Sequence, residues 1–177
     1  MGRADEEIHN PRTGQRMRFL PSDTEAAGAV LRIESFNPPT GVAEPEHVHP
    51  HQESRATVSA GSLLFTVNGV QRRLGPGETL TIPAGTPHYF VNDGEDEAVS
   101  IQEFRPALRT AELFRTLFRL AEQDKLDEHG MPSLLTLAVF GPRFANEIRA
   151  TKPPWPIQRL AFVLLGPIAR VRGVAAA

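Results

Sequence analysis

Turn-forming residues divide the first 105 residues of this chain into many short apolar runs. Gly, Pro, Asn and Asp separate these runs, which is typical of a segment made of β-strands. Val67-Asn68-Gly69-Val70 predicts a hairpin, because Asn-Gly accepts the positive φ angles of a type I′ turn. Many short strands at such spacing indicate a β-sandwich or a β-barrel. We predict strands near Arg16–Leu20, Ala29–Phe36, His47–His49, Arg55–Ala60, Leu63–Val67, Val70–Leu74, Glu78–Ile82, His88–Asn92 and Ala98–Phe104.

The pattern becomes helical after Pro106. Thr110 is expected to cap the first helix, and Gly141-Pro142 is expected to end or kink a later one. We therefore divide the chain into a β-barrel, residues 1–105, and a helical C-terminal extension, residues 106–177, with three to four helices. The predicted helices are Thr110–Gln123, Leu134–Phe140 with Ser133 as its cap, Arg143–Ala150, and Ile157–Val171.

The composition excludes several classes of function. A net charge of −2 over 177 residues gives no reason to expect a nucleic-acid partner. Cysteine is absent, so a metal would have to be held by imidazole and carboxylate. The polar, acidic start of the chain has no apolar stretch behind it, so we expect no secretory signal and a cytoplasmic location. The apolar stretch of the last predicted helix is shorter than the roughly 20 residues that span a bilayer.

Three histidines fall at positions where strands can bring them together. His47 and His49 are two residues apart, so they project from the same face of a strand. If the strand that carries His88 lies beside the first, three neutral imidazoles converge on one point, as a transition-metal site requires. His51 shares the parity of the first two and is a further candidate. Imidazole suits zinc, iron, nickel, manganese or copper, which the sequence does not distinguish, whereas calcium and magnesium prefer oxygen ligands.

The stretches around these histidines resemble the two motifs of the cupin superfamily. Gly41-Val42-Ala43-Glu44-Pro45-Glu46-His47-Val48-His49, followed by Gly61, is similar to the first motif, and Gly77 to Asn92 is similar to the second at every fixed position. The resemblance implies a mainly β fold, a double-stranded β-helix (jelly-roll) barrel of the small single-domain kind. It also implies a metal site inside the barrel.

One position departs from the family's pattern. The acidic ligand of the first motif is separated from the closing glycine by six residues, and counting back from Gly61 this position is Ser54. Strand alternation agrees, because Ser54 and Ala56 suit an inward face and Glu53 an outward one. A serine hydroxyl is a poor ligand, so three imidazoles are the expected set. Glu53 stays a candidate fourth metal ligand if Pro50 introduces a bulge that shifts the strand phase.

The candidate ligand-binding residues are Ser54, Ala56, Phe65 and Phe90. The space beside the small Ser54 and Ala56 can admit an organic molecule, and the two aromatic rings can line the same pocket; their alternative role is barrel core. Gln102 or Glu103, at the end of the last strand, can also face the cavity, but the parity of that strand is undecided.

Two functions follow as expectations. The first is a metal-dependent enzyme that acts on a small organic molecule, with the dioxygenase-, isomerase- or decarboxylase-like chemistry that the resemblance implies. The alternative is a non-catalytic cupin with a degenerate metal site that binds a small ligand or serves in assembly. We expect a homodimer, because cupins usually pair through a sheet edge. A third, weaker idea is that the apolar last helix recruits a partner or a membrane surface; burial within the protein or a dimer is the simpler expectation.

Overall fold

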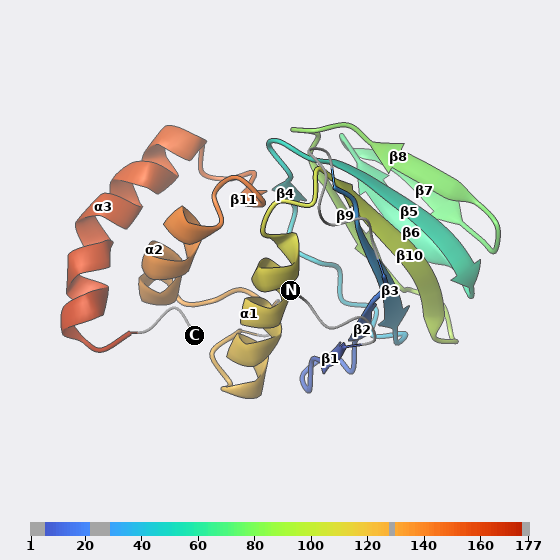
Figure 1. Ribbon diagram of the computed structural model, residues 1–177, viewed down its shortest axis with the longest axis horizontal. Helices are drawn as coiled ribbons and strands as arrows, with labels where there is room; N and C mark the ends of the chain where they lie inside the picture. Colours follow the sequence, from blue (N-terminus) through green and yellow to red (C-terminus); the bar gives the residue numbers. More distant parts are fainter. Residues whose placement is uncertain (1–5, 22–28, 128–129, 175–177) are drawn as a thin grey trace.

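Two antiparallel β-sheets and three helices make up the computed structural model, which describes residues 6–21, 29–127 and 130–174 (Figure 1). The first residues, on which the expected lack of a secretory signal rests, lie mostly outside this part. The larger sheet has the order β1-β2-β3-β10-β5-β8 and the smaller β11-β4-β9-β6-β7. The strands are β1 Glu7–His9, β2 Arg16–Phe19, β3 Leu31–Asn37, β4 His47–Val48, β5 Glu53–Ala60, β6 Leu63–Val67, β7 Val70–Leu74, β8 Thr79–Ile82, β9 His88–Val91, β10 Ala98–Arg105 and β11 Arg149–Ala150.

The predicted jelly-roll barrel is confirmed, and β2 to β10 lie within two residues of the predicted strands. Asn68 and Gly69 have φ angles of 49° and 78°, which makes the predicted type I′ hairpin between β6 and β7. The inner faces of both sheets supply one apolar core cluster: Ala56, Val58, Leu63, Phe65, Leu74, Ile82 and Ala98.

The helices are α1 Thr110–Glu122, α2 Leu134–Arg143 and α3 Trp155–Val171. They lie on one side of the barrel, with α1 nearest the sheets and α3 outermost (Figure 1). Helix α1 covers the part of the larger sheet that the smaller sheet leaves open. Its Phe118 is buried in a cluster with Met17, Phe19, Leu31, Ile33 and Phe104.

Two helix predictions were wrong. Residues 143–150 do not form a helix, because the chain turns after Arg143 and then forms β11 beside β4, with Ala150 opposite His47. Thr110 lies inside α1 and does not cap it. Its hydroxyl instead accepts a hydrogen bond of 2.7 Å from Nε2 of the buried Gln52. The predicted cap at Ser133 is confirmed, since its hydroxyl accepts from the Thr136 N–H.

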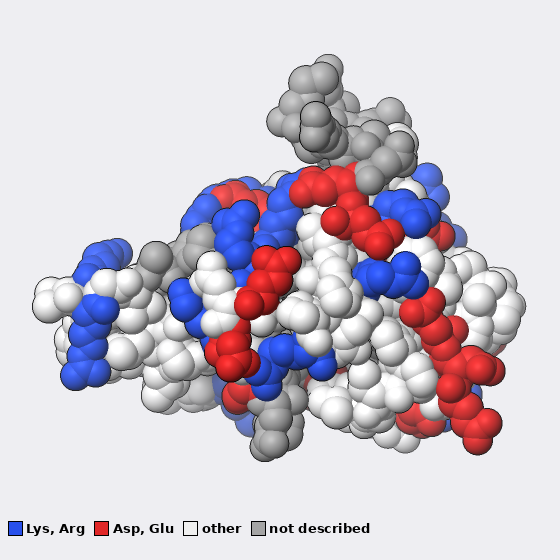
Figure 2. Space-filling view, turned by 90° about the horizontal axis from the view of Figure 1, so that it is seen from below, with Lys and Arg blue, Asp and Glu red and all other residues white. Residues whose placement is uncertain are grey.

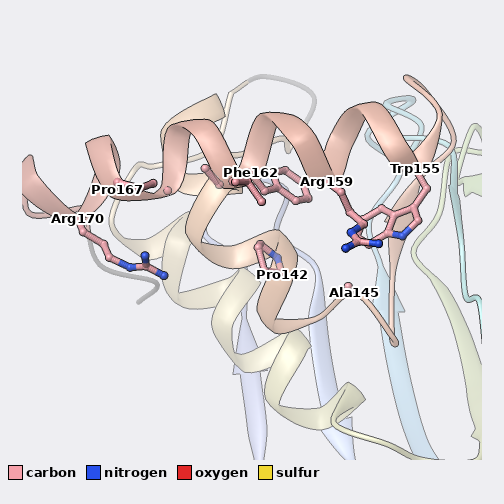
Figure 3. Close-up of a pocket in the computed structure, with 10 residues that line it drawn as sticks. Pro142, Ala145, Trp155, Arg159, Phe162, Pro167 and Arg170 are labelled. Atoms are coloured by element: carbon pink, nitrogen blue, oxygen red, sulfur yellow. The ribbon is translucent and has the colours of Figure 1, made fainter.

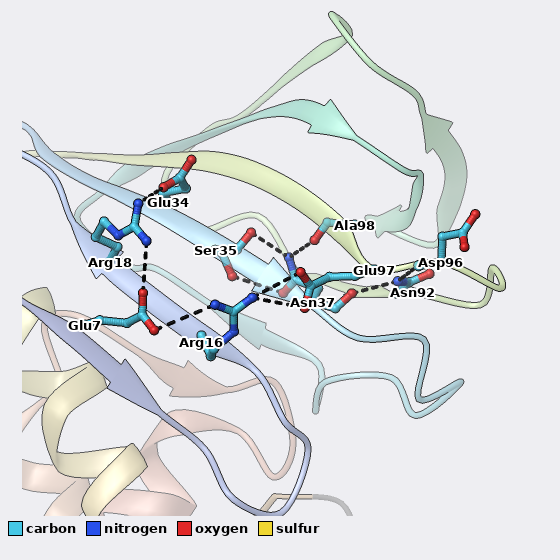
Figure 4. A network of polar contacts seen from close by, with 10 residues as sticks. All are labelled: Glu7, Arg16, Arg18, Glu34, Ser35, Asn37, Asn92, Asp96, Glu97 and Ala98. Atoms are coloured by element: carbon cyan, nitrogen blue, oxygen red, sulfur yellow. Dashed lines mark hydrogen bonds and ion pairs between the residues drawn. The ribbon is translucent and has the colours of Figure 1, made fainter.

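A polar network fixes the end of β9 that lies away from His88 (Figure 4). The buried Asn92 donates from Nδ2 to the carbonyls of Asn37 and Asp96, at 2.7 and 2.8 Å. Asn37 in turn donates to the carbonyls of Ser35 and Ala98. These bonds join β3, β10 and the end of β9, so both sheets are held together at this end of the barrel. An exposed row of ion pairs runs alongside them: Glu7, Arg16, Arg18, Glu34 and Glu97.

Candidate metal centre

Strand pairing brings the three histidines together as the sequence predicted. β4 pairs with β9 in an antiparallel register that places His47 directly opposite His88. The ring centroids are 4.5 Å apart for His47 and His88, and 5.1 Å apart for each of the two pairs that include His49. One ligating nitrogen from each ring lies within 4.8 Å of the other two. Metal–nitrogen bonds of about 2.0–2.1 Å place the nitrogens of a tetrahedral site roughly 3.4 Å apart, and the spacing of these three nitrogens is compatible with ligation of one ion.

Backbone carbonyls fix the tautomer of every ring. Nδ1 of His47 lies 2.8 Å from the Pro45 oxygen, and Nδ1 of His88 lies 2.8 Å from the Thr86 oxygen. Nδ1 of His49 lies 2.6 Å from the oxygen of Glu147. A carbonyl can only accept, so each Nδ1 carries the proton and each Nε2 keeps a lone pair. This is the arrangement in which histidines ligate metals through Nε2.

Burial keeps the three rings neutral. It lowers the pKa of His49 to about 4 and that of His47 well below the ordinary 6.5, and it also lowers the pKa of His88. For His47, the neighbouring His49 and His88 add to this effect, because an imidazolium there would be repelled by a second one. At neutral pH the three lone pairs are therefore free to ligate without first releasing protons.

Comparisons with known proteins agree with this geometry. A family profile described as "Cupin domain" matches residues 36–101, which contain all three histidines. Residues 36–101 form a cupin domain. Protein SchB of Streptomyces halstedii is 31% identical over 91 residues, which are 50% of this chain and 64% of that protein. The chain thus spans just under two thirds of this relative.

The chain is also similar to solved structures, and its likeness to the first of those named next supports the fold alone. An RmlC-like cupin from Shewanella frigidimarina has 22% sequence identity and a TM-score of 0.50, covering 63% of this chain and 92% of its own. KdgF from Halomonas sp. has 20% identity and a TM-score of 0.49, covering 55% of this chain and 84% of its own.

Glu53 does not reach the histidines of the cupin domain. It is exposed on the outer face of β5, opposite Arg105 in register, and lines a small outer depression with Val30, Arg55 and Glu103. Pro50 introduces no bulge that would shift the phase of β5, so the outward direction given by simple alternation holds. His51 is exposed as well. In the described residues, the group that can hold a metal is His47, His49 and His88.

The predicted ligand-binding residues lie on the inner face of the cupin domain. Ser54 and Ala56 are buried there on β5. Ser54 is paired with Phe104 of β10, whose ring lies 5.2 Å from that of His49. Phe65 and Phe90 contact each other at 5.4 Å between ring centroids and pack in the core cluster of the barrel. The structure therefore places Ser54 on the histidine side of the interior and the two aromatic rings in the core.

Two further polar residues lie near the barrel interior: Gln102, whose direction the sequence left open, and the half-buried Glu44, which the sequence did not single out. Gln102 is buried on the inner face of β10, with Ala56 opposite it in register, whereas its neighbour Glu103 points outward to Arg32. Glu44 donates its backbone N–H to the Phe90 carbonyl, and burial raises the pKa of its carboxyl to about 8. Strand alternation shows in the sequence that Gln102 and Glu103 point in opposite directions, but only the pairing of β10 with its neighbours decides which of them faces inward. The sequence holds no such signal for Glu44.

The C-terminal extension takes part in the site. Glu147, whose carbonyl accepts from His49, is buried in the turn between α2 and β11. Its side-chain Oε1 accepts from the Arg109 N–H at the start of α1, at 3.2 Å. The tautomer of His49 thus depends on residues well outside the cupin domain.

Proposed function

We propose that this protein holds a divalent transition metal with His47, His49 and His88 and acts on a small organic molecule inside the barrel. The observation that carries this proposal is that each of the three rings has its Nδ1 hydrogen-bonded to a backbone carbonyl. Packing alone does not require that three neighbouring histidines all bond through Nδ1 to a carbonyl. Metal binding does require a free nitrogen on each ring, and one nitrogen from each of these rings lies within 4.8 Å of the other two.

The ligand set defines the kind of molecule that the site favours. Three neutral imidazoles, with Ser54 at the position of the family's acidic ligand, leave the full charge of a divalent ion uncompensated by the protein. Such a centre favours an anionic oxygen ligand, for example an enolate or a carboxylate. The metal would act as a Lewis acid toward a carbonyl or enolate oxygen.

Two residues of the chain fit a reaction that moves a proton. The Glu44 carboxyl has a pKa of about 8, so it can release and regain a proton near neutral pH. Gln102 offers an amide from the inner face of β10, where it can position a polar group of the substrate. A carboxyl that exchanges a proton near neutral pH favours isomerase-like proton transfer over dioxygenase-like chemistry.

The second candidate function is a binding module without catalysis. Ser54 favours it, since a cupin that lacks the acidic ligand can retain the barrel while losing the reaction. Here the histidines would hold a metal weakly or not at all, and the interior would bind a small ligand.

Metal content separates the two candidates. We would express the protein without a tag, purify it without chelators and measure bound metals by plasma mass spectrometry. We expect close to one metal per chain and a loss of at least tenfold in His49→Ala. His51→Ala is the matched control, because His51 is exposed and lies two residues along the same segment. Substoichiometric metal that His49→Ala leaves unchanged would reject the metal site.

Turnover is the second measurement. Metal-loaded protein would be incubated with a panel of dicarbonyl and phenolic compounds in deuterated water and followed by NMR. Deuterium incorporation next to a carbonyl, abolished by His49→Ala, supports the isomerase-like proposal. Full metal occupancy with no exchange and no oxygen consumption across the panel would reject the enzymatic part of the proposal and leave the metal site standing.

A further inference from the structure

Helix α3 presents an aliphatic face to solvent. One side of the helix is buried through Gln158, Gly166 and Ala169, where it packs on α2. The opposite side carries aliphatic residues at helical spacing, with exposed fractions between 47% and 89%. We call this set the outer face of α3: Ile157, Leu160, Val163, Leu164, Ile168 and Val171. Contiguous exposed aliphatic side chains of this kind mark an interaction surface.

Arginines border the outer face on both sides. At 3.6 residues per turn, Arg159 and Arg170 fall along one edge and Arg172, directly after the helix, along the other. Arg159 and Arg170 also line a groove of about 410 Å³ between α2 and α3, together with Trp155 and Phe162 (Figure 3). An arginine at the edge of an apolar face can bury the aliphatic part of its side chain in an apolar medium, while its guanidinium group stays at the polar boundary of that medium.

The segment that contains α3 carries no acidic residue. Residues 152–177 include four basic residues (Lys152, Arg159, Arg170 and Arg172) and no Asp or Glu, and the one acidic residue between α2 and this segment is Glu147. Glu147 is buried and therefore does not offset them at the surface. In Figure 2 the end of the molecule that carries α3 shows basic and uncharged surface, and the acidic side chains lie elsewhere on that face.

We propose that α3 lies on the surface of an anionic lipid bilayer, with its outer face in the acyl–headgroup boundary and its arginines at the phosphates. This proposal goes beyond the function of the barrel. Aliphatic side chains supply the buried area and the arginines supply attraction to anionic lipids, the two terms that govern interfacial helices. A second copy of the chain fits less well, because pairing two α3 helices would bring together arginine edges that have no acidic partner on either helix. No helix among the described residues is long and apolar enough to cross a membrane, so α3 would lie along the surface.

Vesicle flotation of the full chain tests the proposal. Vesicles of phosphatidylcholine alone are compared with vesicles that also contain phosphatidylglycerol. We expect binding only to the anionic vesicles, with at least a tenfold loss in Leu164→Glu and in the double variant Arg159→Glu/Arg170→Glu. The controls are Val70→Glu and Arg72→Glu, which replace an aliphatic residue and an arginine by glutamate at exposed positions of β7 and should bind like the unaltered protein.

Three outcomes would overturn the proposal. The first is failure to float with anionic vesicles, and the second is binding that Leu164→Glu leaves intact. The third is a dimer in light scattering that Leu164→Glu converts to a monomer in the absence of lipid, which would assign the outer face to a second copy. The substituted side chains are exposed, so each variant should keep its helices, and circular dichroism checks this.

Discussion

Nδ1 of His49 lies 2.6 Å from the backbone oxygen of Glu147, a residue 98 positions further along the chain. This bond makes the turn after α2 a positioning element for one of the three candidate metal ligands. It also explains how a helical extension can affect a site inside a β-barrel: β11 pairs with β4, so the turn is held beside the histidine. Such outer hydrogen bonds orient a ligating ring and set its tautomer.

Glu147→Ala should weaken metal binding. Its side chain holds the turn through the Arg109 N–H, and without this bond the Glu147 carbonyl is less well placed to orient His49. We expect a loss of about tenfold in zinc affinity, measured by competition with a chelating dye. Glu112→Ala is the matched control, because Glu112 pairs with Arg109 and Arg143 at the surface and contacts no histidine. Equal affinities in both variants would contradict the role given to Glu147.

Ser54→Glu should create a fourth ligand. The side chain at this position is buried on the inner face, and its strand partner Phe104 contacts His49. We expect zinc affinity to rise by roughly tenfold, since a carboxylate completes a site of three imidazoles. The metal-free variant should be less stable than the unaltered protein, because it buries an uncompensated carboxyl. Thermal unfolding with and without zinc measures both effects, and a metal-induced shift no larger than that of the unaltered protein would refute this placement of Ser54.

Glu44 should make the metal-free protein less stable as the pH rises above about 6.5. Its pKa is about 8 in the folded state against an ordinary 4.5, so the folded state holds a proton that the unfolded state releases between these values. The free energy of unfolding therefore falls with rising pH in this window. The buried histidines act oppositely below pH 6.5, where their lowered pKa values let the unfolded state bind more protons.

Glu44→Gln isolates this effect. Between pH 6.5 and 8 the lowered pKa values of the histidines no longer contribute. In this interval the Glu44 carboxyl should reduce the unfolding free energy of the unaltered, metal-free protein by on the order of 2 kcal/mol. The variant should lose far less over the same interval. Urea unfolding of the metal-free proteins at several pH values measures the difference. Parallel pH profiles for the two proteins would show that the Glu44 carboxyl is not buried in its neutral form.

Gln52→Ala should destabilise the junction between the barrel and α1. The buried Gln52 donates from Nε2 to the Pro106 carbonyl at 2.7 Å and to the Thr110 hydroxyl at 2.7 Å. Its removal leaves buried acceptors without a donor, which should cost about 2–4 kcal/mol of unfolding free energy. Gln71→Ala, exposed on β7, is the control for loss of a glutamine. A change in urea midpoint no greater than that of the control would contradict this account.

Strand alternation carried much of the prediction. The parity of β5 predicted that Ser54 faces inward and Glu53 outward, and the structure has both in these directions. The alternative in which Glu53 turns inward required a bulge near Pro50, whereas the register shift in the pairing of β5 with β10 lies at the other end of β5, between Val58 and Ala60. Residues whose direction depends on a distant partner were not predictable in this way. Alternation gives Gln102 and Glu103 opposite directions, but the position of β10 between β3 and β5 decides that Gln102 is the one that faces inward.

The region after Arg143 shows most clearly what a local sequence pattern cannot predict. Residues 149–150 carry no strong strand signal, and they become a strand because β4 offers a free edge there. Thr110 is a good cap by its chemistry, yet its hydroxyl is engaged by Gln52, which is 58 residues away. Local preference is worth only a fraction of a kcal/mol to about 1 kcal/mol per residue, so a buried hydrogen bond or a strand partner can override it.

The sequence by itself determined where the strands lie along the chain and that Ser54 faces inward, because side-chain alternation and turn chemistry act over a few neighbouring residues. The jelly-roll barrel and the meeting of His47, His49 and His88 were predicted from the spacing of the two cupin-like motifs. Tertiary structure alone decided that Glu147 orients His49, that the chain returns as β11, and that α3 keeps an aliphatic face in solvent. These features depend on contacts between segments far apart in the chain, and a local pattern carries no information about which distant group will supply the missing partner.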